Sequence, residues 1–305
     1  MIIDLVLSLQ NGYENRGLIT PYLYRYNFYD CCIKVGNDVV PQRISINNIF
    51  RELTIIPTMI TKKIPCLIGV NSVIEIEQLK KEMNMLKPYF DLESLLFICS
   101  NTCIKFKGTN HFINDLDTSR IINIFDFMPN FIDYNKFLFN YSHPFFDCAG
   151  GFFDLDGNEF NMFKYNEFTQ SSIALSNINP RYIGNVIGIL NLFEMFKGFK
   201  KPNNEILYSF LSKNFNNGSQ ILIKDYMLSY SWLDLDKVNS AIKRIGVNVI
   251  CCYGINLIKH LDSFSIIIGG KENIFEDNER SQNKIKNCLI DYFKLNSQIT
   301  EILFF

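Results

Sequence analysis

A segment in the second half of the chain has the residue types of a turn that binds phosphate. Residues 178–192 read INPRYIGNVIGILNL, with Gly184 and Gly188 four positions apart. We expect a strand at residues 171–177 and a buried apolar helix at residues 188–197. A helix N-terminus presents unpaired N–H groups and partial positive charge, and glycines let a ligand approach the backbone closely. The residues predicted to bind a pyrophosphate there are Ile183, Gly184, Asn185, Val186 and Gly188, and backbone N–H groups near Asn177 or Ile178 are predicted to contact the same ligand.

The elements around this turn are expected to form an α/β layer that holds it in place. Residues 151–164 have the pattern of a β-hairpin, because the Asp156-Gly157 dipeptide tolerates the positive φ of a tight turn. A helix is predicted over residues 234–244, where Gly246 would end it. The other predicted elements are strands at residues 220–224, 247–253 and 263–268 and a tail helix at residues 273–294.

The order of these elements over residues 95–270 resembles the GNAT superfamily of acyl-CoA-dependent N-acyltransferases. In that family a strand ends in an apolar-x-Pro-x-Tyr segment, which Ile178, Pro180 and Tyr182 match, and a Gly-rich turn then opens a helix. The resemblance implies an α/β fold with a mixed, mostly antiparallel sheet flanked by helices. It also implies acetyl-CoA or another acyl-CoA as co-substrate, and transfer of the acyl group to an amine of a small molecule or a peptide.

Acyl transfer of this kind needs a base for the amine, an acid for the leaving thiolate and a donor for the thioester carbonyl. Glu167 and Asp147 are the predicted bases, and Tyr230 or Tyr226 is the predicted acid. A backbone N–H at the end of the preceding strand would polarise the carbonyl.

Other interpretations stay open on sequence grounds. The same fold without catalysis would give a binding protein. The run around Asp154 and Asp156 also resembles the first motif of HAD-family phosphatases, in which the first Asp is a nucleophile and Mg²⁺ is required. His143 and Cys148 are close enough in sequence to suggest a Cys–His pair.

We predict three parts in the chain. Residues 1–94 form an α/β segment of unknown role, with strands at residues 3–9, 31–35 and 66–70 and a helix at residues 73–86. Residues 95–270 form the acyltransferase-like domain, and residues 271–305 form a C-terminal helix.

Composition narrows the class of protein. The formal net charge of -1 leaves no excess of cations for a nucleic-acid backbone, so we expect no nucleic-acid partner. The N-terminus has no basic region before its apolar run, and no apolar stretch approaches the length of a membrane span. The nine cysteines form no CxxC pair, so no metal site is expected, and reduced thiols indicate a soluble cytoplasmic protein.

Overall fold

The computed structural model describes residues 1–10, 16–36, 41–69, 72–106, 108–125, 129–151, 179–197, 228–258, 261, 263–276 and 278–305. The chain forms two compact units. Unit 1 comprises Met1–Leu7, Asn15–Gly150 and Asn166–Val186, and unit 2 comprises Ser8–Glu14, Gly151–Tyr165 and Ile187–Phe305.

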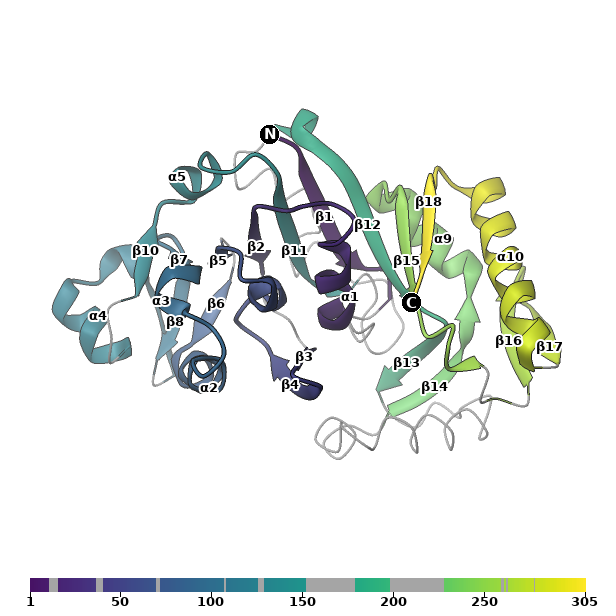
Figure 1. Cartoon of the computed structure of the whole chain (residues 1–305), viewed down its shortest axis with the longest axis horizontal. Coiled ribbons are helices and arrows are strands. Elements are labelled where there is room, and N and C mark those ends of the chain that lie inside the picture. The colour runs from purple at the N-terminus through teal and green to yellow at the C-terminus, as the bar shows by residue number, and fades with distance from the viewer. Residues whose placement is uncertain are drawn as a thin grey trace. The chain divides into compact units, whose positions relative to one another are not determined.

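Unit 1 is built on a parallel sheet (Figure 1, purple to teal). Its strands are β1 (Ile3–Ser8), β2 (Cys31–Val35), β5 (Cys66–Ile68), β7 (Leu96–Cys99), β10 (Asn130–Ile132), β11 (Pro144–Gly151) and the start of β12 (Ile183–Asn191). They follow the order β10-β7-β5-β2-β11-β1, with β12 next to β1. The pairs β2–β5, β5–β7, β7–β10 and β2–β11 are all parallel.

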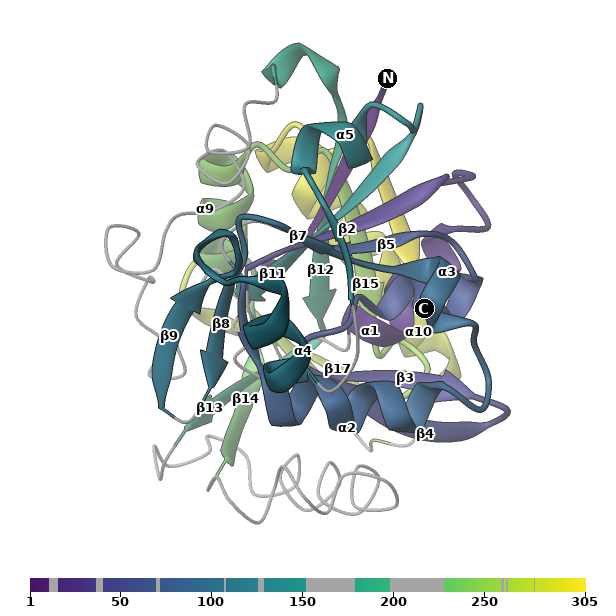
Figure 2. The same ribbon diagram turned by 90° about the vertical axis from the view of Figure 1, so that its left-hand side faces the viewer.

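Helices and two smaller sheets surround this sheet. The helices are α1 (Arg16–Leu23), α2 (Ile76–Leu86), α3 (Leu92–Leu95), α4 (Thr118–Phe125) and α5 (Tyr134–Leu138), and the short 3-10 turns are η1 (Thr58–Lys62), η2 (Ile113–Asp115) and η3 (Pro180–Tyr182). The hairpin consists of β3 (Gln42–Ile46) and β4 (Ile49–Leu53), and the third sheet of β6 (Val73–Glu75), β8 (Cys103–Phe106) and β9 (Thr109–Phe112). Figure 2 shows α2 beside the hairpin.

The central strands of unit 1 are buried along their whole length. Every residue of β1 and of β2 is buried, which is why both read as nearly continuous apolar runs in the sequence. Each run carries one charged residue, Asp4 in β1 and Lys34 in β2, and both are shielded from solvent. A buried charge needs hydrogen-bonding or ionic partners, so these two residues mark polar clusters inside the sheet.

Unit 2 contains two sheets. The end of β12 pairs in parallel with β15 (Val249–Tyr253), which pairs in parallel with β18 (Glu301–Phe304). The second sheet has the order β13-β14-β16-β17, with β13 (Phe193–Lys197), β14 (Leu228–Asp234), β16 (Ser263–Ile268) and β17 (Lys271–Glu276). Helix α9 (Leu235–Ile245) starts at the Asp234 cap and ends at Gly246, and α10 (Asn278–Asn296) follows β17. Neither these helices nor any other in the described ranges is long and apolar enough to cross a bilayer.

The α/β class is confirmed, but the predicted sheet type is wrong. The large sheet of unit 1 is parallel, whereas the acyltransferase-like fold required a mostly antiparallel one. The helix predicted at residues 188–197 is also wrong, because these residues belong to the strands β12 and β13. The first residues of the predicted tail helix form β17 instead. The predicted hairpin at residues 151–164 and the strands at 171–177 and 220–224 lie outside the described residues, apart from Gly151 in β11.

Candidate functional site

The carboxyl ends of β1 and β11 lie where the path of the chain through the sheet of unit 1 changes direction. From β1 the chain continues to β2, which lies beyond β11, whereas the next described strand after β11 is β12, beyond β1. Ligands of parallel α/β sheets bind outside the carboxyl ends of the strands, near the point where the strand order changes direction. The sheet topology therefore places a candidate site at this edge.

A buried ion pair joins helix α1 to strand β11 at this edge. Arg16, the first residue of α1, is fully buried, and its Nε lies 2.8 Å from Oδ1 of Asp147 in β11. Its Nη1 also donates to the carbonyl oxygen of Cys148, at 2.8 Å. The guanidinium thus holds the start of α1 against β11. Removing one partner of such a pair leaves the other charge buried without compensation.

A second cation lies next to this pair in the sheet. Lys34 of β2 is the register partner of Asp147, so both side chains lie on the same face of neighbouring strands. Lys34 is 1% exposed, and its ammonium donates to the carbonyl oxygen of Thr54. This group, which we call the Arg16–Asp147–Lys34 cluster, thus contains two basic side chains and one carboxylate. Basic side chains at the carboxyl edge of a sheet favour an anion as the ligand.

The hairpin β3–β4 contacts the first turn of α1. The backbone N–H of Gly17 donates to Oε1 of Gln42 at 3.2 Å, and Gln42 is buried. A Cβ on Gly17 would lie 2.5 Å from the carbonyl oxygen of Arg43, a contact that only glycine permits. The start of α1 is therefore fixed by β11 and by the hairpin.

Thiol chemistry is disfavoured at this edge. Burial first, and then the negative charge of Asp147, raise the pKa of Cys148 to about 12, so its thiol stays protonated. Its Sγ lies 3.9 Å from the carbonyl oxygen of Phe146, whereas the His143 ring lies beside Asp4. The suggested Cys–His pair is therefore not assembled. Among the described residues, no group of three or more His, Cys, Asp and Glu is placed to hold a metal ion.

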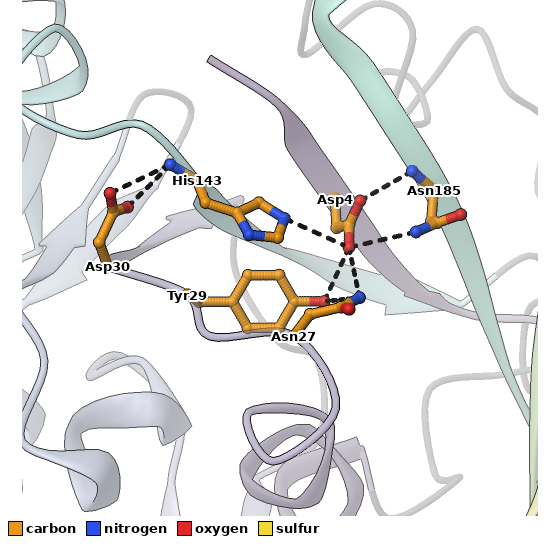
Figure 3. Close-up of polar contacts among 6 residues, drawn as sticks. All are labelled: Asp4, Asn27, Tyr29, Asp30, His143 and Asn185. Carbon is orange, nitrogen blue, oxygen red and sulfur yellow. Dashed lines mark hydrogen bonds and ion pairs between the residues drawn. The ribbon is translucent and has the colours of Figure 1, made fainter.

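A second polar cluster lies at the opposite, amino-terminal edge of the sheet in unit 1 (Figure 3). Asp4 is fully buried, and its Oδ2 accepts from the hydroxyl of Tyr29 at 2.9 Å and from Nδ2 of Asn27 at 3.1 Å. Its Oδ1 accepts from the backbone N–H of Asn185 at 2.8 Å, and Nε2 of His143 lies 3.7 Å from Oδ2. Since ligands of parallel sheets bind at the carboxyl edge, we interpret this cluster as structural.

The predicted pyrophosphate turn has a different local structure. Ile183, Gly184, Asn185, Val186 and Gly188 all lie in β12, so no helix N-terminus is present there. A Cβ on Gly188 would lie 2.6 Å from the side chain of buried Leu9, and one on Gly184 would lie 2.6 Å from that of Ile2. Close packing against β1 thus accounts for both glycines. That these five residues belong to a binding site stays a prediction. Asn177 and Ile178 lie outside the described residues.

The predicted catalytic residues are not brought together by the described structure. Tyr230 lies on β14 of unit 2, where it is the register partner of Met195. Asp147 lies in β11 of unit 1 and is bound to Arg16. The remaining candidates, Glu167 and Tyr226 for acyl transfer and Asp154 and Asp156 for a phosphatase, lie outside the described residues.

Three residues of the candidate site were missed by the sequence interpretation: Arg16, Lys34 and Gln42. One signal was available, because the expected strand at residues 3–9 is followed within a few residues by Gly12, the basic residue Arg16 and Gly17. Lys34 in an otherwise apolar run was a second signal. No local pattern indicates that either residue would meet Asp147.

Unit 2 holds a buried acid of its own. Glu194 of β13 is 5% exposed, and its Oε2 lies 3.1 Å from Nζ of Lys237 on α9. Burial raises the pKa of Glu194 above its ordinary value of 4.5, and the Lys237 ammonium opposes part of this shift. The folded protein therefore holds this proton more tightly than the unfolded chain does.

We expect Glu194 to make unit 2 less stable as the pH rises. A raised folded-state pKa contributes stability that is fully present below about pH 4.5 and is lost as the pH rises through the folded pKa. Urea unfolding of Glu194→Gln should therefore show a gain in stability over wild type that grows with pH across that window. Glu272→Gln on exposed β17 is the control and should follow wild type. Parallel curves for wild type and Glu194→Gln would contradict this assignment.

Comparisons with known proteins show what this fold resembles. No protein-family model and no curated protein sequence matches the chain. Among solved structures, the chain is similar to fully ligated adenylosuccinate synthetase from Plasmodium falciparum, with a TM-score of 0.75 and 12% identity, over 99% of this chain and 96% of that one. It is also similar to succinoaminodeoxyadenylate synthetase of cyanophage S-2L bound to dGMP and dATP, with a TM-score of 0.62 and 11% identity, over 95% of this chain and 99% of that one.

These similarities correct the functional interpretation. The chain has the fold of adenylosuccinate synthetase, so the resemblance to GNAT N-acyltransferases is wrong. Acyl transfer, acyl-CoA as co-substrate, a non-catalytic GNAT-like protein and a HAD-like phosphatase are overturned with it. The motif at residues 178–192 led to the wrong family because its apolar residues and glycines are equally compatible with a buried strand, which residues 183–191 form.

Proposed function

We propose that this chain binds a purine nucleotide at the carboxyl ends of β1, β2 and β11. The observation that carries the proposal is the buried Arg16–Asp147–Lys34 cluster on β2 and β11, where the strand order of the sheet changes direction. The same edge of an α/β sheet is where such folds bind their ligands. The fold is shared with two nucleotide synthetases, one of them described as bound to dGMP and dATP.

The charge of the cluster supports a phosphate group as the part of the ligand that binds nearest to it. The chain as a whole has a net charge of -1, so long-range attraction of an anion is weak. Attraction must then come from local cations, and Arg16 and Lys34 are held rigidly by Asp147 and Thr54. Buried cations act in a low-dielectric environment, where their attraction for a phosphate is stronger than at the surface.

We expect purine nucleotides to raise the melting temperature of the protein. A ligand that binds only the folded state at a concentration of 100 times its Kd stabilises by about 2.7 kcal/mol. The entropy of unfolding of 305 residues is about 0.64 kcal/mol/K, so this corresponds to a shift of about 4 °C. Differential scanning fluorimetry with dGMP, GMP, dATP and ATP, followed by calorimetry, measures the shift and the Kd.

Two controls show whether the effect is specific. The pyrimidine nucleotide dCMP tests recognition of the base, and acetyl-CoA tests a ligand that carries phosphates but belongs to the rejected interpretation. Both dCMP and acetyl-CoA should give a smaller melting shift and a weaker Kd than the purine nucleotide that binds most tightly. Absence of any melting shift and of any heat of binding with all four purine nucleotides at millimolar concentration would overturn the proposal.

A synthetase reaction is the second candidate function. It is favoured by the extent of the similarity, because the chain covers 96% and 99% of the two synthetases. A succinoamino group is an aspartate residue attached through its nitrogen, so a small-molecule amine stays the proposed second substrate. Mass spectrometry of a mixture of dGMP, dATP, aspartate and the protein should then detect a succinoamino nucleotide. Binding without this product would leave nucleotide binding as the function.

The cytoplasm stays the proposed location. The nine cysteines, all of them free thiols, support this proposal. The net charge of -1 supports the proposal of no nucleic-acid partner, and we also propose no membrane partner.

A further inference from the structure

A buried carboxylate on α2 binds the segment that follows the β3–β4 hairpin. Glu82 is 1% exposed. Its two oxygens accept from the backbone N–H groups of Thr54 at 2.7 Å, Ile55 at 3.1 and 3.2 Å, and Ile56 at 2.9 Å, and Oε1 also accepts from Nε2 of Gln78 at 2.8 Å. Three consecutive N–H groups that converge on one carboxylate fix the path of the backbone there.

The same segment holds a cation of the candidate site. The backbone N–H of Thr54 donates to Glu82, and the carbonyl oxygen of Thr54 accepts from the ammonium of Lys34. Lys34 in turn is the register partner of Asp147, which is bound to Arg16. A continuous path of polar contacts therefore runs from α2 to the Arg16–Asp147–Lys34 cluster.

The segment is also tied to α1. The hydroxyls of Thr58 and Thr20 lie 2.7 Å apart, and Gln42 accepts from Gly17 at the first turn of α1. A shift of the backbone near Thr54 would thus be felt at the start of α1 as well as at Lys34. The carboxylate of Glu82 binds this backbone from α2.

We infer, on the premise of the nucleotide site proposed above, that Glu82 is a positioning residue of that site. Its carboxylate does not contact the ligand. It fixes Thr54, and Thr54 fixes the ammonium of Lys34 where the phosphate of the nucleotide is attracted.

The test is the affinity for dGMP and dATP, measured by calorimetry below the melting temperature of every variant. Glu82→Gln replaces one accepting oxygen with an amide that faces N–H donors, so we expect a loss of about tenfold in affinity. Lys34→Met should give a loss of similar size. In the double variant the two losses should not multiply, because Glu82 acts through Lys34.

Two controls on α2 separate positioning from loss of stability. Glu77→Gln removes an exposed carboxylate of the same helix and should leave affinity and melting temperature unchanged. Leu79→Ala removes a fully buried side chain and should lower the melting temperature while the affinity stays within about twofold. Should Glu82→Gln fail to fold, Glu82→Asp replaces it in the single and double variants. Its loss of affinity and that of Lys34→Met should again not multiply.

The outcomes distinguish this inference from the proposed function. If wild type binds none of dGMP, GMP, dATP and ATP, the proposed function fails and the inference fails with it. If wild type binds and Glu82→Gln binds equally well, or if its loss multiplies with that of Lys34→Met, the proposed function stands and the role of Glu82 is overturned. Loss of affinity in Leu79→Ala equal to that in Glu82→Gln would also overturn it.

Discussion

Replacing Arg16 with methionine should lower the free energy of unfolding by about 3–5 kcal/mol, a large share of the stability of a typical domain. The guanidinium and the carboxylate of Asp147 are both shielded from solvent, at 0% and 1% exposure. The variant leaves that carboxylate buried with its ion-pair partner removed, and the carbonyl of Cys148 loses a donor. Urea unfolding monitored by far-UV circular dichroism measures the change in midpoint and slope.

The double variant Arg16→Met, Asp147→Leu should recover most of this loss. Apolar residues of similar volume often replace a buried ion pair at no cost, because neither charge then has to leave water. Arg120→Met, at an exposed position of α4, is the control and should change stability by less than about 0.5 kcal/mol. If Arg16→Met and Arg120→Met behaved alike, the pair would not hold α1 against β11.

The sequence predicted the elements whose ends carry local signals. The strand at residues 31–35 has the same bounds as β2. The helix predicted at residues 234–244 corresponds to α9, because Asp234 accepts from the N–H groups of its first turn and Gly246 ends it in the left-handed region, at φ 81°. Capping residues and glycines determine where a helix begins and ends through contacts within a few residues, so a single sequence is enough to predict these ends.

The apolar run at residues 183–197 shows where such signals fail. It was predicted to be a turn and a buried helix, but it forms β12 and β13. A strand buried on both faces is apolar throughout, so periodicity does not distinguish it from a buried helix. Gly184 and Gly188 then suggested a phosphate cradle, although their role is close packing against β1.

The candidate site depended on sheet order, which no local pattern contains. Lys34 and Asp147 face each other because β11 inserts between β2 and β1, although they are far apart in the chain. The same insertion brings Asp147 to Arg16. Sequence alone marked Asp147 as an acid of interest and assigned it the role of a base, whereas its contact with Arg16 makes it the counter-ion of a buried cation.

Replacing Asp4 with alanine should lower the free energy of unfolding by about 2–4 kcal/mol. The carboxylate accepts from the hydroxyl of Tyr29 and from the backbone and side chain of Asn185, as well as from Asn27 (Figure 3). Leaving buried donors without an acceptor costs about 1–3 kcal/mol each, and more for bonds to a charged group. Thermal and urea unfolding of the variant measure the loss.

The comparison with Tyr29→Phe shows whether Asp4 acts as the centre of its cluster. That variant removes one hydrogen bond and keeps the carboxylate with its other donors, so we expect a loss of only about 1 kcal/mol. Asp4→Asn keeps one accepting oxygen but places an NH₂ group against donors, so its loss should fall between the other two. Because Asp4 lies at the amino edge of the sheet, all three variants should bind nucleotide with the affinity of wild type at temperatures where they are folded. A selective loss of nucleotide affinity in Asp4→Asn would contradict the structural role and move the site to this edge.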